Sequence, residues 1–366
     1  MKKRTVVSLS AAGAAGAVAA VLPLFVNPPK PFAPAADGSC WMASLPDDMP
    51  LSQVVLPGTH DSATEKIFFA SIARCQHLTI PQQLDAGCRF LDLRLRMRNS
   101  QLIAVHGVTP CYQVSGGRAV AYTFDQIVDS IYAFLRRNPS ETVLVSIKNE
   151  GKEDNAAFFR YLRQYIERCP HRWYTENRVP AVGEARGKMV LLRRFSLQGV
   201  SADDGSSGLN LQPALWGNMG GRKTTGYKKF HMTLQNGEHG SGVCLQDCYS
   251  LGVRKKWFFG IKPLLDRGRY HNELLLNFFS CTGRLFPVAA ALPLNRLYQT
   301  YESQAVKNGG ILIFDFLNAR LAARVYRENP AVPRKVPDAA ESSNEKVPLL
   351  ARYLSGYCNL LYRIFD

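Results

Sequence analysis

Several signals that mark nucleotide-binding and nucleic-acid-binding proteins are missing from this chain of 366 residues. It has no glycine-rich dinucleotide loop, no cysteine and histidine spacing of the zinc-finger type, and no basic helix interleaved with aromatic residues. No internal repeat or long low-complexity tract stands out, which argues against a repeat architecture. What remains is a globular chain with 46% apolar residues, enough for a sizeable core.

Acidic residues are scarce in this sequence. There are 29 Asp and Glu against 45 Lys and Arg, which gives a formal net charge of +16. Such a surplus favours an anionic partner, either nucleic acid or an acidic membrane surface. Because charge is the only nucleic-acid signal, we expect no nucleic-acid partner.

The two ends of the chain differ from its middle. Lys2, Lys3 and Arg4 precede an Ala-, Gly- and Val-rich stretch that runs to Val26, and small residues at 33–35 offer a cleavage site. This pattern predicts a signal peptide over residues 1–36 and secretion to the extracellular or periplasmic space. Since about 20 apolar residues can also span a bilayer, an uncleaved anchor is the alternative.

A Pro-, Ser- and charge-rich linker is expected after the central region, from residue 329 to 347. A C-terminal amphipathic helix over 349–365 follows it, and docking of this helix onto the main domain is favoured over membrane contact. A single catalytic domain is therefore expected over residues 37–328, in a monomeric protein.

Nine cysteines fit an oxidising compartment, but their odd number leaves at least one without an intrachain partner. Cys244 and Cys248 fall on one face of a predicted strand. No second Cys or His pair with zinc spacing accompanies them, so a disulfide or a place in the core is favoured over a metal site.

Apolar, β-branched runs alternate with helical patterns through the central region. The expected strands cover 53–56, 88–96, 102–106, 142–148, 189–195, 242–249, 274–279 and 310–316. The expected helices include 124–137, 155–169, 253–267 and 296–307. This alternation predicts an α/β fold, a distorted TIM (βα)8 barrel with outer helices. Two doubly wound domains are the alternative, and no dinucleotide loop supports them.

Charged residues recur at the ends of these strands. In the strand over 88–96, Asp92 and Arg94 share one face while leucines occupy the other, so the charged face is expected to look into the barrel. The same reasoning places further polar side chains at the carboxyl ends of strands, namely Lys148, Arg194, Asp247, Tyr249 and Asp315. Barrel enzymes carry their active sites at that face. Mutual neutralisation of buried charges is the structural alternative for any single residue, but it does not explain so many together.

Two histidines belong to this expected site. Only three residues separate Met97 from Gln101, too few for a crossover, so the chain turns back as a hairpin and brings His106 beside Arg94. His60 follows another strand in the stretch VLPGTHDS. Taken alone, that stretch also fits an ordinary turn. Together, the two imidazoles are candidates for acid–base chemistry.

Eight segments in order from about residue 39 to 317 carry a resemblance to a known family. They are WM followed by LPDD, then LPGTHDSAT, GCRFLDLR, AVHG, SETVLVSIKNE, ARGKMVLLRRF, CLQDCY and GILIFDF. Together they resemble the bacterial phosphatidylinositol-specific phospholipase C barrel, an X-domain-like barrel. The resemblance implies an enzyme that cleaves phosphatidylinositol in membranes into diacylglycerol and inositol 1,2-cyclic phosphate.

The resemblance also implies catalytic roles. His60 would take the proton of the inositol 2-hydroxyl, and Asp315 would orient His60 and stabilise its protonated ring. Arg94 would neutralise charge on the phosphoryl oxygens. His106, supported by Asp61, would protonate the departing diacylglycerol oxygen.

The remaining strand-end residues would bind substrate by the same resemblance. Lys148, Arg194 and Asp247 would contact inositol hydroxyls, and Tyr249 would pack on the inositol ring. Metal-dependent relatives hold calcium near the position of Arg94, so a guanidinium there implies an enzyme without a metal cofactor. One carboxylate that could bind such a calcium ion, that of Asp92, is still present two residues before Arg94.

Two other functions remain open from the sequence. One is a related barrel phosphodiesterase acting on another glycerophospholipid or on glycosyl-phosphatidylinositol anchors. The other is a barrel that binds headgroups without cleaving them.

Overall fold

The structure is a computed structural model that describes residues 32–151, 154–197, 207–211, 213–216, 219, 226–233, 239–266, 273–282, 286–301 and 309–333. Most of the expected signal segment and the whole of the expected C-terminal helix lie outside these residues. Within them, no helix has both the length and the apolar character needed to cross a bilayer.

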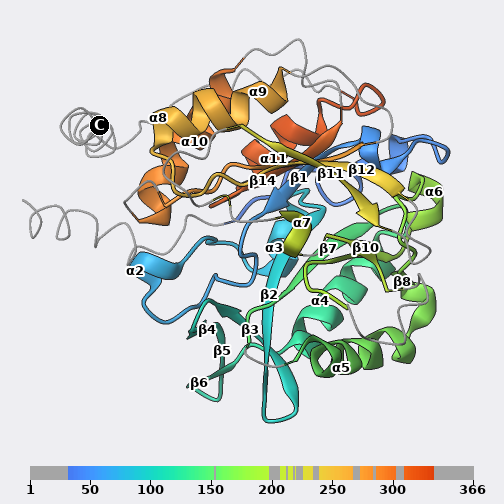
Figure 1. The fold of residues 1–366 in the computed structure, drawn as a ribbon, viewed down its shortest axis with the longest axis vertical. Coiled ribbons are helices and arrows are strands. Elements are labelled where there is room, and N and C mark those ends of the chain that lie inside the picture. The colour runs from blue at the N-terminus through green and yellow to red at the C-terminus, as the bar shows by residue number, and fades with distance from the viewer. Residues whose placement is uncertain are drawn as a thin grey trace, which may run out of the picture.

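One curled sheet organises the fold (Figure 1). Its strands follow the order β10 (Leu209–Asn210), β9 (Met189–Arg193), β7 (Val143–Asn149), β2 (Phe90–Arg98), β1 (Val55–Thr59), β14 (Gly310–Phe314), β13 (Glu273–Phe278), β12 (His239–Gln246) and β11 (Lys228–Thr233). Neighbours along this path pair in parallel, except that β11 and β12 are antiparallel. Among the described residues no pairing joins β10 to β11, so this is the barrel expected from the sequence, left open on one side.

Helices lie between the strands along the chain, and the longer ones pack on the outside of the sheet. They are α2 (Ala70–Ala73), α3 (Ile80–Asp85), α4 (Phe124–Arg137), α5 (Asn155–Arg168), α6 (Val182–Ala185), α7 (Pro213–Trp216), α8 (Val253–Lys255), the π-helix η4 (Lys256–Ile261), α9 (Lys262–Leu265), α10 (Pro287–Thr300) and α11 (Ala319–Tyr326). Short 3₁₀ turns are η1 (Trp41–Ser44), η2 (Leu51–Gln53) and η3 (Pro170–Arg172), and β8 (Trp173–Tyr174) pairs with β9. Helix α4 has the predicted bounds, because Thr123 and Gln126 cap its first turn reciprocally.

The predicted helix over 296–307 is wrong in its bounds. Helix α10 begins with Pro287 in its first turn, where a missing N–H costs nothing, and continues through Pro293 to Thr300. Buried Leu294 and Tyr298 anchor it on the barrel, and this packing outweighs the hydrogen bond lost at Pro293. The pattern over 253–267 is divided into α8, η4 and α9 rather than forming one α-helix.

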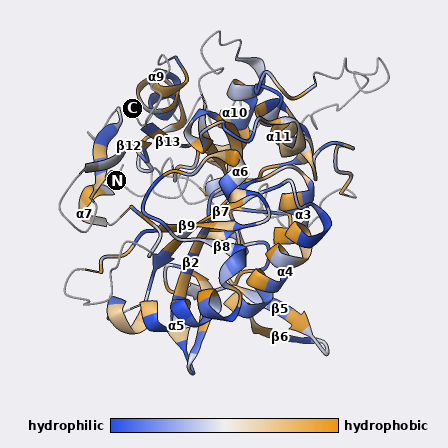
Figure 2. Ribbon diagram, turned by 90° about the vertical axis from the view of Figure 1, so that its right-hand side faces the viewer, coloured by the Kyte–Doolittle hydropathy of each residue, from blue (hydrophilic) through white to orange (hydrophobic). Residues whose placement is uncertain are grey.

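The two faces of the strands pack into separate cores. Alternate residues such as Leu91, Leu93 and Leu95 join the helices in an outer cluster, while Phe90 and Leu144 join an inner cluster. Along α5, hydrophilic and hydrophobic residues alternate on the ribbon, as an outer helix requires (Figure 2). Charged side chains on the inner face of β2 therefore lie within the barrel.

The hairpin expected after β2 is present. Residues Asn99 and Ser100 form its turn with φ of 50° and 59°, and β3 (Gln101–His106) runs back antiparallel to β2. With Leu95 opposite Ala104, His106 lies within one residue of the position opposite Arg94. Beyond it lie β4 (Thr109–Pro110) and the hairpin of β5 (Tyr112–Ser115) and β6 (Arg118–Ala121).

The cysteines of the described part of the chain, all except Cys358, are free thiols. Cys244 and Cys248 are both buried, so of the two roles left open for this pair the core role applies. The packed region also continues past residue 328, because the buried Asn329 side chain bonds the backbone of Val55 in both directions.

Candidate active site

The carboxyl ends of the parallel strands bring the predicted residues to one end of the barrel. His60 follows β1, Arg94 lies on β2, Lys148 on β7, and Asp315 follows β14. His106 ends the antiparallel β3 and reaches the same place through the hairpin. Chain segments far apart in sequence therefore supply one polar cluster, as active sites of barrel enzymes require.

His60 is held from both sides of its ring. Its Nδ1 lies 2.8 Å from Asp315 Oδ1, and Arg94 Nη2 lies 2.8 Å from its Nε2. The Gln76 amide donates to the carbonyls of His60 at 2.8 Å and Phe314 at 2.9 Å, which ties the ends of β1 and β14 together. Because guanidinium nitrogens only donate, the Arg94 contact requires a neutral His60 with its proton on Nδ1. That is the form a general base needs.

The protonation of His60 is governed by opposing influences. Burial lowers the pKa of His60, but the carboxylates of Asp61 and Asp315 raise it to about 9. The positive charge of Arg94 lowers this pKa, against the carboxylates. The raised pKa favours the protonated ring, whereas the Arg94 contact at Nε2 fits only the neutral ring, so His60 is fully available as a base only above its pKa.

His106 is arranged for the opposite role. Its Nδ1 donates to the Ala73 carbonyl at 2.8 Å, and its Nε2 lies 3.4 Å from Asp61 Oδ2. A protonated ring would therefore satisfy both of its N–H groups, which suits a general acid. The rings of His60 and His106 lie 6.5 Å apart between centroids at 82° to each other, within one pocket as expected.

Asp61 links the two histidines. Its Oδ2 lies 3.3 Å from His60 Nε2 as well as 3.4 Å from His106 Nε2, and its Oδ1 lies 2.6 Å from Arg94 Nε. Burial raises the pKa of Asp61, but Arg94 and the two histidines hold it below its usual range. Asp61 has a φ of 44°, a left-handed conformation that the surrounding contacts maintain. Asp61 therefore contacts more than the single partner, His106, that the sequence led us to expect.

Arg94 lies among carboxylates. Besides Asp61, Asp92 Oδ2 lies 3.5 Å and Glu150 Oε1 lies 3.4 Å from its guanidinium. Lys148 Nζ shares Glu150 at 2.6 Å. These contacts fix a cation 2.8 Å from His60, and Asp61 links it to His106, so an anionic group between the two imidazoles would meet it.

The other expected binding residues lie around this centre. Arg194 donates to Asp92 at 2.8 Å, and its guanidinium lies 3.7 Å from the centre of the Trp216 ring. Trp216 in turn donates to Asp247 at 3.2 Å. Tyr249 lies in the turn after β12 with 42% of its side chain exposed.

Three residues of this site were missed from the sequence. Glu150 lies two positions after Lys148, just past the end of β7, so the alternation that selected Lys148 could have found it if continued by one step. Gln76 and Trp216 lie outside the strands, on segments that periodicity does not place. Their contacts depend on how the strand ends come together.

The same donors form groups that could hold a metal ion. His60 with Asp61 and Asp92 is one group, and Cys75 joins either His60 and Asp315 or Asp61 and His106. The first group already surrounds Arg94, whose charge occupies the place of a cation. These residues therefore fit a guanidinium-centred site better than a calcium site at this point.

Fold and site together define an α/β barrel equipped for acid–base chemistry on an anionic group. Residues 49–195 match the family model described as phosphatidylinositol-specific phospholipase C, X domain. The chain is 25% identical over 317 residues to the 1-phosphatidylinositol phosphodiesterase of Listeria monocytogenes, covering 82% of this chain and 88% of that protein. A protein of the same name from Staphylococcus aureus is 29% identical over 165 residues, 42% of this chain and 50% of the other.

Solved structures agree on the fold. The phosphatidylinositol-specific phospholipase C of Listeria monocytogenes matches with a TM-score of 0.59 at 23% identity, over 80% of this chain and 98% of the other. The Staphylococcus aureus enzyme matches with a TM-score of 0.63 at 21% identity, over 80% and 97%. The chain is thus similar to the bacterial phosphatidylinositol-specific phospholipases C, and its residues 49–195 match the X domain of that family.

Proposed function

We propose that this protein is a phosphatidylinositol-specific phospholipase C that works without a metal cofactor. The observation that carries the proposal is the arrangement of two imidazoles around Asp61 and Arg94. His60 Nε2 faces the Arg94 guanidinium, and His106 donates from Nδ1 to a carbonyl and has its Nε2 at Asp61. An enzyme of this kind needs one base, one acid and a cation at the phosphate between them.

The reaction begins with the inositol 2-hydroxyl. His60 Nε2 takes its proton while the oxygen attacks the adjacent phosphorus, and the ring then becomes an imidazolium between Asp61 and Asp315. Because nucleophile and phosphorus belong to one molecule, little association entropy is lost. Arg94 turns from Nε2 of His60 to the phosphate oxygens as the substrate enters, which frees the base.

The second half of the step breaks the bond from phosphorus to the glycerol oxygen. His106 donates its Nε2 proton to that oxygen, so diacylglycerol leaves as a neutral alcohol and inositol 1,2-cyclic phosphate remains. Lys148, Arg194 and Asp247 lie around the same centre and would bind the ring hydroxyls.

The test is a lipid assay on the purified chain in excess chelator. We expect diacylglycerol and the cyclic phosphate from phosphatidylinositol at the same rate with and without chelator, because Arg94 replaces a metal ion. Phosphatidylcholine is the control lipid and should remain intact. Loss of activity in chelator would overturn the metal-free mechanism. Cleavage of a glycosyl-phosphatidylinositol in preference to the plain lipid would favour the anchor-specific alternative.

We further propose that the apolar rim beside His106 contacts the membrane. Phe69 is 74% exposed, Ile72 is 56% exposed, and Val108 in the turn after β3 is 86% exposed. Helix α2 lies next to His106, whose ring bonds the Ala73 carbonyl, and Figure 1 shows α2 on the same side as the β4–β6 extension. Large exposed apolar side chains at the mouth of a site suit an interfacial substrate.

The double variant Phe69→Ser with Ile72→Ser should bind phosphatidylinositol vesicles at least about 100-fold more weakly, because each side chain contributes about 1.5–3 kcal/mol when buried. Cleavage of a short-chain, monomeric phosphatidylinositol should be nearly unchanged. Leu297→Ser is the matched control, since this exposed residue lies in the last turn of α10, where the chain returns to the amino end of β14. Equal losses on both substrates would show that the rim acts on the site rather than on the membrane.

A further inference from the structure

One side chain within the active site has no part in the proposed reaction. Cys75 follows α2, and its side chain is buried with 1% exposed. Its backbone is fixed at both ends, because its N–H donates to Thr64 Oγ1 at 3.0 Å and its carbonyl accepts from Phe316 at 2.7 Å. The thiol therefore has a set position beside the catalytic groups.

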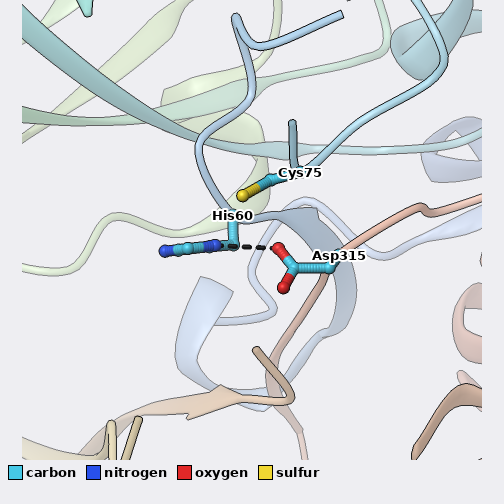
Figure 3. Close-up of side chains that lie close together, drawn as sticks. All are labelled: His60, Cys75 and Asp315. Atoms are coloured by element: carbon cyan, nitrogen blue, oxygen red, sulfur yellow. Dashed lines mark hydrogen bonds and ion pairs between the residues drawn. The ribbon is translucent and has the colours of Figure 1, made fainter. Parts of the chain in front are cut away.

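The position of the thiol is close to several metal-ligating atoms. Figure 3 shows Cys75 directed toward the hydrogen bond between His60 and Asp315. One ligand atom from each of these three residues lies within 4.8 Å of the others. The same sulfur lies 3.9 Å from Asp61 Oδ2 and forms a second group of three with Asp61 and His106.

These separations are near those of a bound zinc ion. With bonds of about 2.3 Å to sulfur and about 2.0–2.1 Å to nitrogen or oxygen, tetrahedral zinc holds its ligands roughly 3.3–3.8 Å apart. The His60 Nδ1 and Asp315 Oδ1 atoms, 2.8 Å apart in their hydrogen bond, would have to separate by about 0.5 Å, and the Cys75 sulfur would have to approach them by about 1 Å or less. The pocket supplies the entry path, since His60 is partly exposed.

We propose that Cys75, His60 and Asp315 form an inhibitory site for a divalent transition-metal ion of the zinc type. The inhibitory part of this inference rests on the proposed function; the metal site does not. Binding releases the thiol proton to solvent and places the metal on Nδ1 of His60, so the ring proton moves to Nε2. There it donates to Asp61 Oδ2, 3.3 Å away, and the Arg94 contact at that nitrogen is lost. A ring with its proton on Nε2 cannot take the proton of the substrate hydroxyl, and catalysis stops.

The donor set discriminates among cations. A thiolate and an imidazole favour zinc, cobalt or cadmium, whereas magnesium and calcium prefer oxygen ligands. Arg94 contacts Nε2 of His60, so the nitrogen that the metal would bind, Nδ1, is not the one that Arg94 holds. The proposed site is thus chemically distinct from the calcium site of metal-dependent phospholipases, for which Arg94 substitutes.

Cobalt provides a test that does not depend on activity. We expect one equivalent of Co²⁺ to give a thiolate-to-cobalt charge-transfer band in the full chain, and Zn²⁺ to displace it. Cys75→Ser should lose the band and bind zinc at least about 10–100-fold more weakly. Cys169→Ser is the matched control, because the Cys169 sulfur lies 3.7 Å from a nitrogen of His171 at the surface and offers a competing thiol–imidazole pair. A band that persists in Cys75→Ser, or disappears in Cys169→Ser, overturns the site.

The activity arm tests inhibition. Zinc should inhibit phosphatidylinositol cleavage by the unmodified chain, chelator should restore it, and magnesium at the same concentration should have no effect. Cys75→Ser and Cys75→Ala should need at least about tenfold more zinc for the same fractional inhibition, because both variants bind zinc more weakly. The inhibition of each variant is measured relative to its own metal-free rate. Unchanged zinc sensitivity in both variants overturns the inhibitory role. A chain that binds cobalt through Cys75 but never cleaves the lipid supports the metal site and overturns the proposed function instead.

Discussion

Replacement of His60 by alanine is expected to lower kcat/KM for phosphatidylinositol by about 10⁴-fold, near the upper range for a general base. His60 has one nitrogen at Arg94 and the other at the buried carboxylate of Asp315, so its replacement removes the base that these two groups position. The measurement is the initial rate of diacylglycerol release, with circular dichroism to verify folding. Activity within tenfold of the unmodified protein would contradict the assignment.

The matched variant Asp315→Asn keeps the shape of the partner and removes its charge. Burial lowers the pKa of His60 while Asp61 and Asp315 raise it, so loss of the Asp315 charge must lower it. Because the base works only when neutral, kcat/KM should rise with pH through the His60 pKa. The ascending limb, which lies above the usual histidine range in the unmodified protein, should move to lower pH in Asp315→Asn. An unshifted limb would show that another group controls it.

Much of the fold was predictable because it depends on local patterns. Apolar runs at strand spacing located β2, β7, β9 and β14 to within two residues, and alternation sorted their side chains correctly between the inner and outer cores. The hairpin after β2 followed from chain length alone. Helix α10 was misplaced because its stability comes from tertiary packing across Pro293, which no local rule contains.

The site was predictable where a residue occupies a strand end and not elsewhere. Alternation on the strands gives the direction of Arg94 and Lys148 but says nothing of Gln76, which joins two strand ends from a loop. It also missed the second contact of Asp61, because that contact depends on a left-handed backbone turn after β1. Cys75 was counted among the cysteines, yet only the three-dimensional arrangement places its sulfur beside the base.

Replacement of His106 by alanine should produce a loss that depends on the leaving group. On phosphatidylinositol, where an alcohol oxygen must be protonated as it departs, we expect kcat/KM to fall by about 10³-fold. On an inositol phosphodiester with a nitrophenolate leaving group, which departs without a proton, kcat/KM of the same variant should fall only about tenfold. This smaller loss reflects the charge and positioning that His106 contributes apart from its proton.

His60→Ala is the control that separates the two histidines, because a lost base slows attack whatever group leaves. It should be equally impaired on both substrates. The same comparison tests Asp61, which lies 3.4 Å from Nε2 of His106 and 3.3 Å from Nε2 of His60. If Asp61 serves both imidazoles, Asp61→Asn should lose activity on both substrates, and more on the lipid. If His106→Ala instead loses as much on the nitrophenyl substrate as on phosphatidylinositol, His106 does not protonate the leaving oxygen, and the assignment of acid and base across Arg94 is wrong.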